Sequence, residues 1–287
     1  MRVSIVWKPV RGRGCRDSRQ ARFQTVLRAA LNTRLYGPVL RAAGLGTPER
    51  IAGLASIEEA LALIPPTEVG GVSLNSSVAA VRPIPGLPPR GLFWPLPRAG
   101  RTAVLLPGFP RAWKVKPFNP RETLRLAEWR PEAVAGPVSE LQRLADQIED
   151  QWGRMPALSH SVLAFVTLRQ AFLSDQTRDR FWRVFKVPVF GQIFGLSGEL
   201  LAWECEAHEG YHIAEQRAVI EVDQRRGQPE LLVTSLAGLL RPAIRLATGL
   251  EGRIEHSACG CGRRGPRLVD VRLKTPARIA VAAASAA

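Results

Sequence analysis

Residues 194–213 read FGLSGELLAWECEAHEGYHI and mark the point where the pattern of the sequence changes. Before this stretch, apolar runs at Val162–Thr167 and Val187–Phe194 flank an amphipathic segment for which Ser174 is a suitable helix N-cap. A strand, a helix and a strand in this order are typical of parallel α/β structure. The stretch therefore ends a predicted parallel α/β core and leads into a part of the chain with the period of strands.

Downstream of this point the sequence predicts an antiparallel β subdomain. Apolar residues alternate with polar ones over several short runs, and polar turn residues separate the runs. We expect the runs to form one antiparallel meander. The predicted strands are Leu200–Cys205, Tyr211–Ile213, Arg217–Val222 and Glu230–Leu236.

Upstream of the core the sequence predicts helices first and then an irregular segment. Apolar residues recur at helical spacing over Ala21–Ala43, with a break expected at Gly37-Pro38 and a cap at Gly44. A short helix is expected over Ser56–Leu63, with Ser56 as its N-cap.

Prolines then crowd residues 68–120, where only Thr102–Leu106 resembles a strand, so we interpret the rest as a surface connection. After it we expect a helix at Arg121–Trp129, a strand at Ala133–Ala135 and a helix for which Ser139 is the N-cap. The expected division is an N-terminal helical segment at 1–67, a Pro-rich connection at 68–120, a parallel α/β core at 121–199, a β subdomain at 200–275 and a flexible tail at 276–287.

The composition restricts the class of protein. A hydrophobic fraction of 46% is enough for a core, and no run of about 18 apolar residues predicts a membrane span. The formal charge of +15 permits binding to nucleic acid or other anions, but the basic residues are scattered, with short clusters only at Arg11–Arg22 and Arg263–Arg267. A basic surface without nucleic-acid binding explains this pattern better. Since no secretory signal is recognisable, we expect a cytoplasmic protein with reduced cysteines.

Four residues in two distant stretches have the chemistry of a metal site. Cys205 and His212 are separated by an expected hairpin turn, and the tight turn CGCG carries Cys259 and Cys261. Three thiolates and one imidazole would fill tetrahedral zinc with no open position, which favours a structural ion. The alternative is that these are ordinary buried cysteines. His208 and His256 are spare candidates for the imidazole ligand, and Cys15 has no assigned role.

Several motifs, in order, resemble those of phenylacetate–CoA ligase-like enzymes of the adenylate-forming superfamily. The stretch 194–213 is similar to the family's Tyr-Gly-x-Thr/Ser-Glu, Glu-Cys-Glu and Gly-x-His-Ile sequence. Further matches are PELLVTS at 229–235, RLATGL at 245–250 against Arg-Tyr-Arg-Thr-Gly-Asp, and CGCGR at 259–263 against Cys-x-Cys-Gly-Arg. The resemblance extends to the N-terminal helices at Phe23–Thr67 and covers about two thirds of the chain.

The resemblance implies a truncated ligase large domain and an adenylation cleft. It would place Glu199 on magnesium, and Ser197, Arg245 and Thr248 at the nucleotide. The family's cysteine and histidine positions coincide with the four residues assigned to zinc. If the protein is active, ATP or AMP, magnesium, coenzyme A and a carboxylic acid are the expected ligands.

Departures from the family pattern place the activity in doubt. The Ser/Thr/Gly-rich loop that grips a triphosphate is absent, and residues 68–120 stand in its place. The acidic residue Glu199 is shifted by one position, and Leu250 replaces the aspartate that holds the ribose hydroxyls. The sequence ends before the family's mobile C-terminal domain. A lysine of that domain assists adenylation in the family, and Lys274 of this sequence is a poor substitute for it.

Three hypotheses for the function follow from these observations. The first is a shortened relative of the ligases with little or no adenylation activity, which binds a nucleotide, an acyl group or a protein partner. The second is a working acyl- or aryl-CoA ligase that a partner chain completes. The third is a zinc-stabilised basic module that binds nucleic acid through Arg11–Arg22 and Arg263–Arg267.

Overall fold

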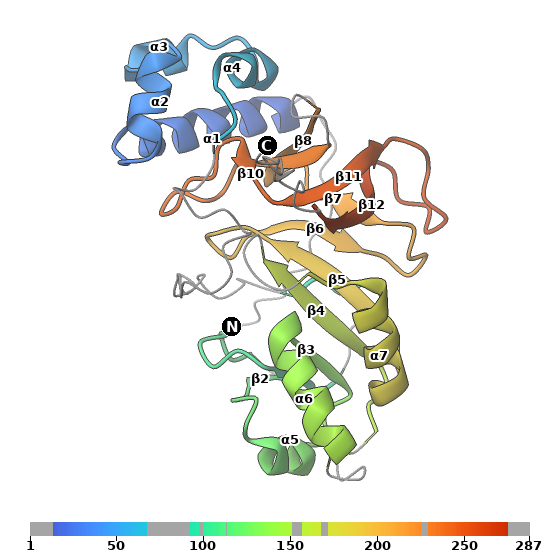
Figure 1. Cartoon of the computed structure of the whole chain (residues 1–287). Coiled ribbons are helices and arrows are strands. Elements are labelled where there is room, and N and C mark those ends of the chain that lie inside the picture. Colours follow the sequence, from blue (N-terminus) through green and yellow to red (C-terminus); the bar gives the residue numbers. More distant parts are fainter. Residues whose placement is uncertain are drawn as a thin grey trace, which may run out of the picture.

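The structure is a computed structural model, and it describes residues 14–67, 92–97, 100–112, 114–150, 157–167, 172–224 and 229–274. The basic lead-in before residue 14, the side chain of Cys15, the Pro-rich segment up to residue 91 and the tail 276–287 lie outside the described residues. A nine-stranded sheet and a three-stranded sheet form the frame (Figure 1). In the part of the chain that the structure describes, no helix is both long and apolar enough to cross a membrane.

One half of the large sheet is parallel. Strands β3 (Ala133–Pro137), β4 (Ser161–Thr167) and β5 (Val189–Phe194) are neighbours, and β1 (Thr102–Val104) and β2 (Val115–Pro117) continue the sheet beyond β3. All residues of β1, β3 and β5 are buried. The predicted parallel core is confirmed, but the Pro-rich segment contributes two strands to it, whereas the sequence predicts only one.

Helices α6 (Val138–Asp150) and α7 (Asp175–Phe185) lie along one face of this parallel half, and the shorter α5 (Thr123–Trp129) lies beneath α6 (Figure 1). The Ser174 hydroxyl accepts a hydrogen bond from the Thr177 N–H at 3.2 Å, which confirms this N-cap. Ser139 is not a cap, because α6 begins at Val138 directly after β3.

The other half of the large sheet is antiparallel and carries the hairpin of the quoted stretch. Beyond β5 the order is β6 (Leu200–Glu204), β7 (Tyr211–Ile213), β12 (Arg267–Leu273) and β11 (Leu250–Glu255). Every pair from β5 outward is antiparallel. The strand pairing thus changes from parallel to antiparallel at residues 195–199, where the sequence pattern changes.

The expected single meander is wrong, because its strands belong to two sheets. Strands β8 (Ala218–Asp223), β9 (Glu230–Ser235) and β10 (Leu246–Ala247) form a separate antiparallel sheet. The β7–β8 connection therefore passes from one sheet to the other, and β12 takes the expected place of β8 beside β7.

The N-terminal helices pack on the small sheet. Helices α1 (Gly14–Leu31), α2 (Tyr36–Ala42), α3 (Pro48–Ala52) and α4 (Ile57–Leu63) share a buried apolar cluster that includes Leu236 and Ile244. The Ser56 hydroxyl accepts from the Glu59 N–H at 3.0 Å, as expected for the N-cap of α4.

The expected helix break lies earlier than Gly37-Pro38. The first helix ends at Leu31, and the Thr33 hydroxyl accepts from the Tyr36 N–H at 3.1 Å where the second begins. Pro38 lies in the first turn of α2, where no intrahelical N–H is needed. Gly44 follows this helix with φ of 75°, in agreement with its predicted capping role.

Candidate metal centre

The β6–β7 hairpin brings Cys205 and His212 to one side of the turn. Cys205 follows the last residue of β6, and His212 lies in β7 opposite Trp203. Gly210 has φ of 98°, and a Cβ at this position would lie 2.3 Å from the Leu268 carbonyl oxygen of β12. Only glycine therefore allows the hairpin to approach β12 this closely.

The loop between β11 and β12 supplies the other two thiols. The Gly262 N–H donates to the Cys259 carbonyl at 2.8 Å and closes the turn that contains Cys261. The Gly260 N–H donates to the Glu209 carboxylate of the hairpin at 2.9 Å. This bond joins the two distant stretches, so the four side chains converge.

The four ligand atoms have the spacing of a tetrahedral metal site. All lie within 4.8 Å of one another. The Sγ atoms of Cys205 and Cys259 are 3.5 Å apart, and Cys261 Sγ lies 3.4 Å from His212 Nε2. Zinc–sulfur bonds of about 2.3 Å imply edges of about 3.7 Å between ligand atoms in a tetrahedron. The group could therefore hold a metal such as zinc.

The surroundings of the ligands are dry and favour neutral imidazole. Burial raises the pKa of Cys205, and it raises the pKa of Cys259 to about 12. Burial alone would also raise the pKa of Cys261, but the backbone N–H of Arg263 and neighbouring groups outweigh it and lower this pKa. Burial lowers the pKa of His212, so its ring is neutral and able to bind a metal at neutral pH.

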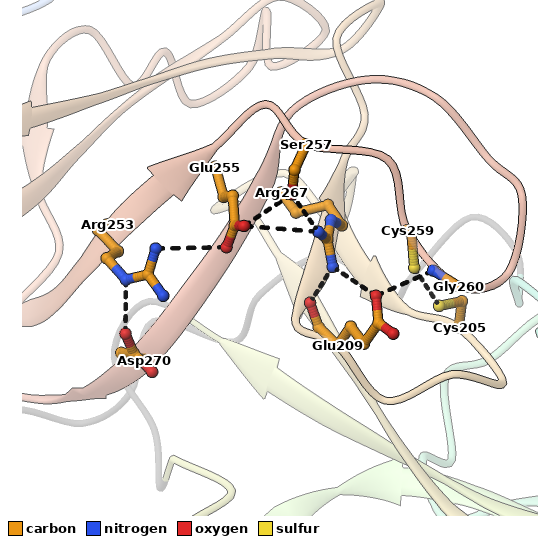
Figure 2. A network of polar contacts seen from close by, with 9 residues as sticks. All are labelled: Cys205, Glu209, Arg253, Glu255, Ser257, Cys259, Gly260, Arg267 and Asp270. Atoms are coloured by element: carbon orange, nitrogen blue, oxygen red, sulfur yellow. Dashed lines mark hydrogen bonds and ion pairs between the residues drawn. The ribbon is translucent and has the colours of Figure 1, made fainter.

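A chain of polar contacts supports the turn that holds the thiols (Figure 2). The Arg267 side chain is only 4% exposed; it donates to the Glu209 carbonyl at 2.6 Å and to the Glu209 carboxylate at 3.1 Å. Its second terminal nitrogen donates to the Ser257 hydroxyl at 2.9 Å. The sequence analysis placed Arg267 in a basic cluster and gave Glu209 no role, so neither was expected to support the metal site, although both lie close in sequence to the proposed ligands.

The two spare histidines do not join the group. The His208 ring stacks on Phe190, with ring centroids 4.7 Å apart and an interplanar angle of 5°. His256 is exposed, and the cluster found among the described residues consists of Cys205, His212, Cys259 and Cys261.

The residues assigned to magnesium and nucleotide are buried. The Ser197 N–H donates to the Glu199 carboxylate at 2.9 Å, so the side chain of Glu199 folds back over its own loop. Glu199 is also close enough to Arg217 for their charges to interact. The Ser197 hydroxyl donates to the Arg241 carbonyl at 3.4 Å.

Arg245 and Thr248 make contacts within the fold. One Arg245 terminal nitrogen donates to the Leu61 and Ile64 carbonyls at the end of α4, at 3.0 and 2.6 Å. Its Nε donates to Glu221 at 3.1 Å. The Thr248 hydroxyl donates to the Leu231 carbonyl at 2.7 Å.

Comparison with known proteins finds likeness in structure alone. No family model matches the chain, and no curated protein matches it either. 2-Hydroxyisobutyryl-CoA ligase in an open conformation with 2-HIB-AMP and CoA superimposes with a TM-score of 0.62 and 16% identity, over 88% of this chain and 68% of that one. The same ligase in its thioesterification state gives 0.62 and 17%, over 90% and 68%.

A second ligase shares less of the structure. Coronafacic acid ligase from Pectobacterium brasiliense gives a TM-score of 0.40 and 15% identity, over 60% of this chain and 39% of that one. The match to 2-hydroxyisobutyryl-CoA ligase spans most of the chain but only about two thirds of that enzyme. The chain therefore has an acyl-CoA ligase-like fold.

Proposed function

We propose that the protein is a divergent relative of phenylacetate–CoA ligase-like enzymes that keeps their fold but does not adenylate acids by itself. The observation that carries the proposal is the set of hydrogen bonds that the Arg245 side chain makes within the fold. Its guanidinium holds the end of α4 against the small sheet through Leu61, Ile64 and Glu221. A side chain with these partners is not free to reach an adenylate.

Two further positions support the loss of adenylation. Leu250, at the position of the family's ribose-binding aspartate, is buried and its backbone N–H donates to the Thr248 hydroxyl at 3.1 Å. A leucine side chain cannot accept the ribose hydrogen bonds, and each bond left unmade costs about 1–3 kcal/mol. The buried carboxylate of Glu199 already accepts a bond from its own loop and lies near a cation.

Within this proposal the metal is structural zinc held by Cys205, His212, Cys259 and Cys261. The ligands are buried or nearly so, and all four come from the chain itself. Such an ion leaves no position for a substrate, so it would fix the hairpin to the loop between β11 and β12 rather than take part in a reaction.

Pyrophosphate exchange tests the proposal directly. The purified protein, with its zinc content measured by mass spectrometry, is incubated with ATP, magnesium, labelled pyrophosphate and a panel of aryl and fatty acids. One zinc per chain without exchange is expected. Robust exchange by the isolated protein would refute the loss of adenylation, and Glu199→Gln would then show whether Glu199 carries it.

The nucleic-acid hypothesis has less support from the C-terminal arginines. Arg267 is buried and bound to Glu209, and Arg263 pairs with Glu206 at 2.6 Å. A salt titration of binding to a random duplex would detect this function if it exists, since phosphate contacts release counterions.

A further inference from the structure

Residues 92–97, here called the strap, lie within the Pro-rich connection and pack on the large sheet. The contacts with an apolar cluster of its parallel half come from Leu92, Trp94 and Leu96. The cluster includes Phe190 and Phe194 of β5, and alternate residues of a strand point to the same face. The strap therefore covers the face of β5 to which Gln192 also belongs.

A row of side chains leads across this face from the strap to the metal centre. Gln192 of β5 pairs with Trp203 of β6, and Trp203 pairs with His212 of β7. Residues directly opposite each other in antiparallel strands point to the same face, so these three side chains are neighbours there. Since His212 belongs to the group that could hold a metal, the strap and the metal centre share one face of the sheet.

Trp203 contacts both the strap and a candidate metal ligand. Its ring stacks with the His212 imidazole, with centroids 5.9 Å apart and an interplanar angle of 24°. Phe93 of the strap meets the same indole, with centroids 4.6 Å apart and an angle of 42°. Both separations lie in the range of attractive aromatic pairs. Trp203 is only 7% exposed, so a shift of one of its neighbours is felt by the other.

Side-chain contacts, rather than strand pairing, hold the strap on the sheet. The Gln192 side-chain amide donates to the Phe93 carbonyl at 2.6 Å, and His160 Nε2 donates to the Pro97 carbonyl at 2.5 Å. In the described part of the chain, the strap belongs to no strand and forms no isolated β-bridge. Its docking therefore depends on a few contacts, of which the one between Phe93 and Trp203 leads to the metal centre.

We propose that metal binding by Cys205, His212, Cys259 and Cys261 is coupled through Trp203 to the docking of the strap. A metal bound to His212 holds the imidazole on which the indole stacks, and the indole is the surface on which Phe93 rests. Because linkage is reciprocal, the docked strap raises the affinity for the metal by the factor by which the metal favours docking. The inference rests on the zinc site of the proposed function and extends its effect to the Pro-rich connection.

Zinc affinity of the full chain, measured by competition with a chromophoric chelator, tests the coupling from the side of the strap. Phe93→Ala changes no ligand and should weaken zinc binding about three- to tenfold. Leu96→Ala is the matched control, because it removes contacts of the same strap with the sheet but spares the ring pair; it should change the affinity less than about twofold.

Two variants of Trp203 separate an aromatic contact from simple filling of space. Trp203→Leu should weaken zinc binding at least as much as Phe93→Ala. Trp203→Phe keeps a ring between His212 and Phe93 and should recover most of the affinity. A far-ultraviolet circular dichroism spectrum equal to that of the wild type establishes that each zinc-loaded variant is folded.

Chymotrypsin tests the coupling from the side of the metal, because cleavage after Phe93 requires the strap to leave the sheet. Removing zinc with a chelator should raise the initial rate of this cleavage at least about tenfold. Phe181 of α7 is fully buried and reports on global unfolding, so it should stay uncut. In Trp203→Leu, cleavage after Phe93 should be fast with or without zinc. Mass spectrometry of the peptides distinguishes the two sites.

The outcomes separate this inference from the zinc assignment. A wild-type protein that binds no zinc would refute both. If zinc binds but Phe93→Ala and Leu96→Ala have the same affinity, Trp203 does not couple the strap to the metal. Unchanged cleavage after Phe93 would mean that the strap stays docked without zinc. Equal cleavage after Phe93 and Phe181 would mean that zinc stabilises the whole domain and not the strap in particular, and either result overturns the coupling.

Discussion

Replacing Arg245 by methionine separates a structural role from a nucleotide-binding role. The side chain is largely buried, and the substitution keeps much of its length while it removes the guanidinium. Two carbonyls at the end of α4 lose a charged donor, and Glu221 loses its ion pair. A charge-assisted hydrogen bond contributes about 1.5–3 kcal/mol, and the half-buried Glu221 adds less.

We therefore expect the free energy of unfolding to fall by about 3–4 kcal/mol. Urea denaturation of the zinc-loaded protein, followed by far-ultraviolet circular dichroism, measures the difference. Arg125→Met is the matched control, because Arg125 forms only an exposed pair with Glu122 on α5. It should cost no more than about 0.5 kcal/mol. Arg245→Lys should recover part of the loss, since an ammonium can reach one of the carbonyls but lacks the planar fork.

The result that would refute the structural role is equally clear. If Arg245→Met unfolds at the same urea concentration as Arg125→Met, the α4 carbonyls do not depend on the guanidinium. If the same variant then loses ATP binding that the wild type shows in a thermal-shift assay, Arg245 faces the nucleotide as the family resemblance implies. The proposed loss of adenylation would fall with it.

Four further outcomes are expected. Removing the metal with a chelator should lower the calorimetric melting midpoint by about 10 °C. The Cys259→Ser variant should have a low melting midpoint even before the chelator is added, and the chelator should not lower it further. An unchanged midpoint would contradict a structural ion. Because burial raises the pKa of Cys205 and holds that of Cys259 at about 12, zinc must displace thiol protons, so affinity should weaken at least about tenfold per unit as pH falls below 8; calorimetry in buffers of different ionisation enthalpy counts those protons, and a count of zero would refute thiolate ligation. Arg267→Leu should weaken zinc binding about 10- to 100-fold in competition with a chromophoric chelator. Equal affinity would show that the turn carrying Cys259 and Cys261 keeps its structure without Arg267. Gly191→Ala would place a Cβ 2.5 Å from the Tyr211 hydroxyl and should cost about 2 kcal/mol in urea unfolding; a neutral effect would mean that Tyr211 can move.

Local signals in the sequence were sufficient for the parallel core. The caps at Ser56 and Ser174 depend on a hydroxyl and an N–H three residues later, so the sequence contains all that determines them. Strands β4 and β5 are apolar over nearly their whole length because helices or loops cover both faces. These elements are recognisable without knowledge of their neighbours.

Pairing between distant strands was not recognisable in the same way. The β8 and β9 segments have strand character, but nothing in them tells that they leave the large sheet. The alternation of apolar and polar residues in VDVRL at 269–273 is a strand signal that could have located β12. Its position beside β7 follows from contacts such as that of Gly210 with Leu268, which join residues far apart in sequence.

The candidate site also has one part that the sequence predicts and one part that it does not. Metal ligands can be inferred from residue type and spacing, because thiols and imidazole on two turns have few other reasons to converge, and the structure brings those four together. A motif such as RLATGL at 245–250 identifies a position in the fold but not the direction of its side chains. Arg245 is turned toward α4 by two carbonyls that lie more than 180 residues earlier in the chain. Whether a chain with a ligase-like fold can carry out ligase chemistry therefore depends on the partners of each side chain at the cleft positions, and here Arg245 is bound within the fold.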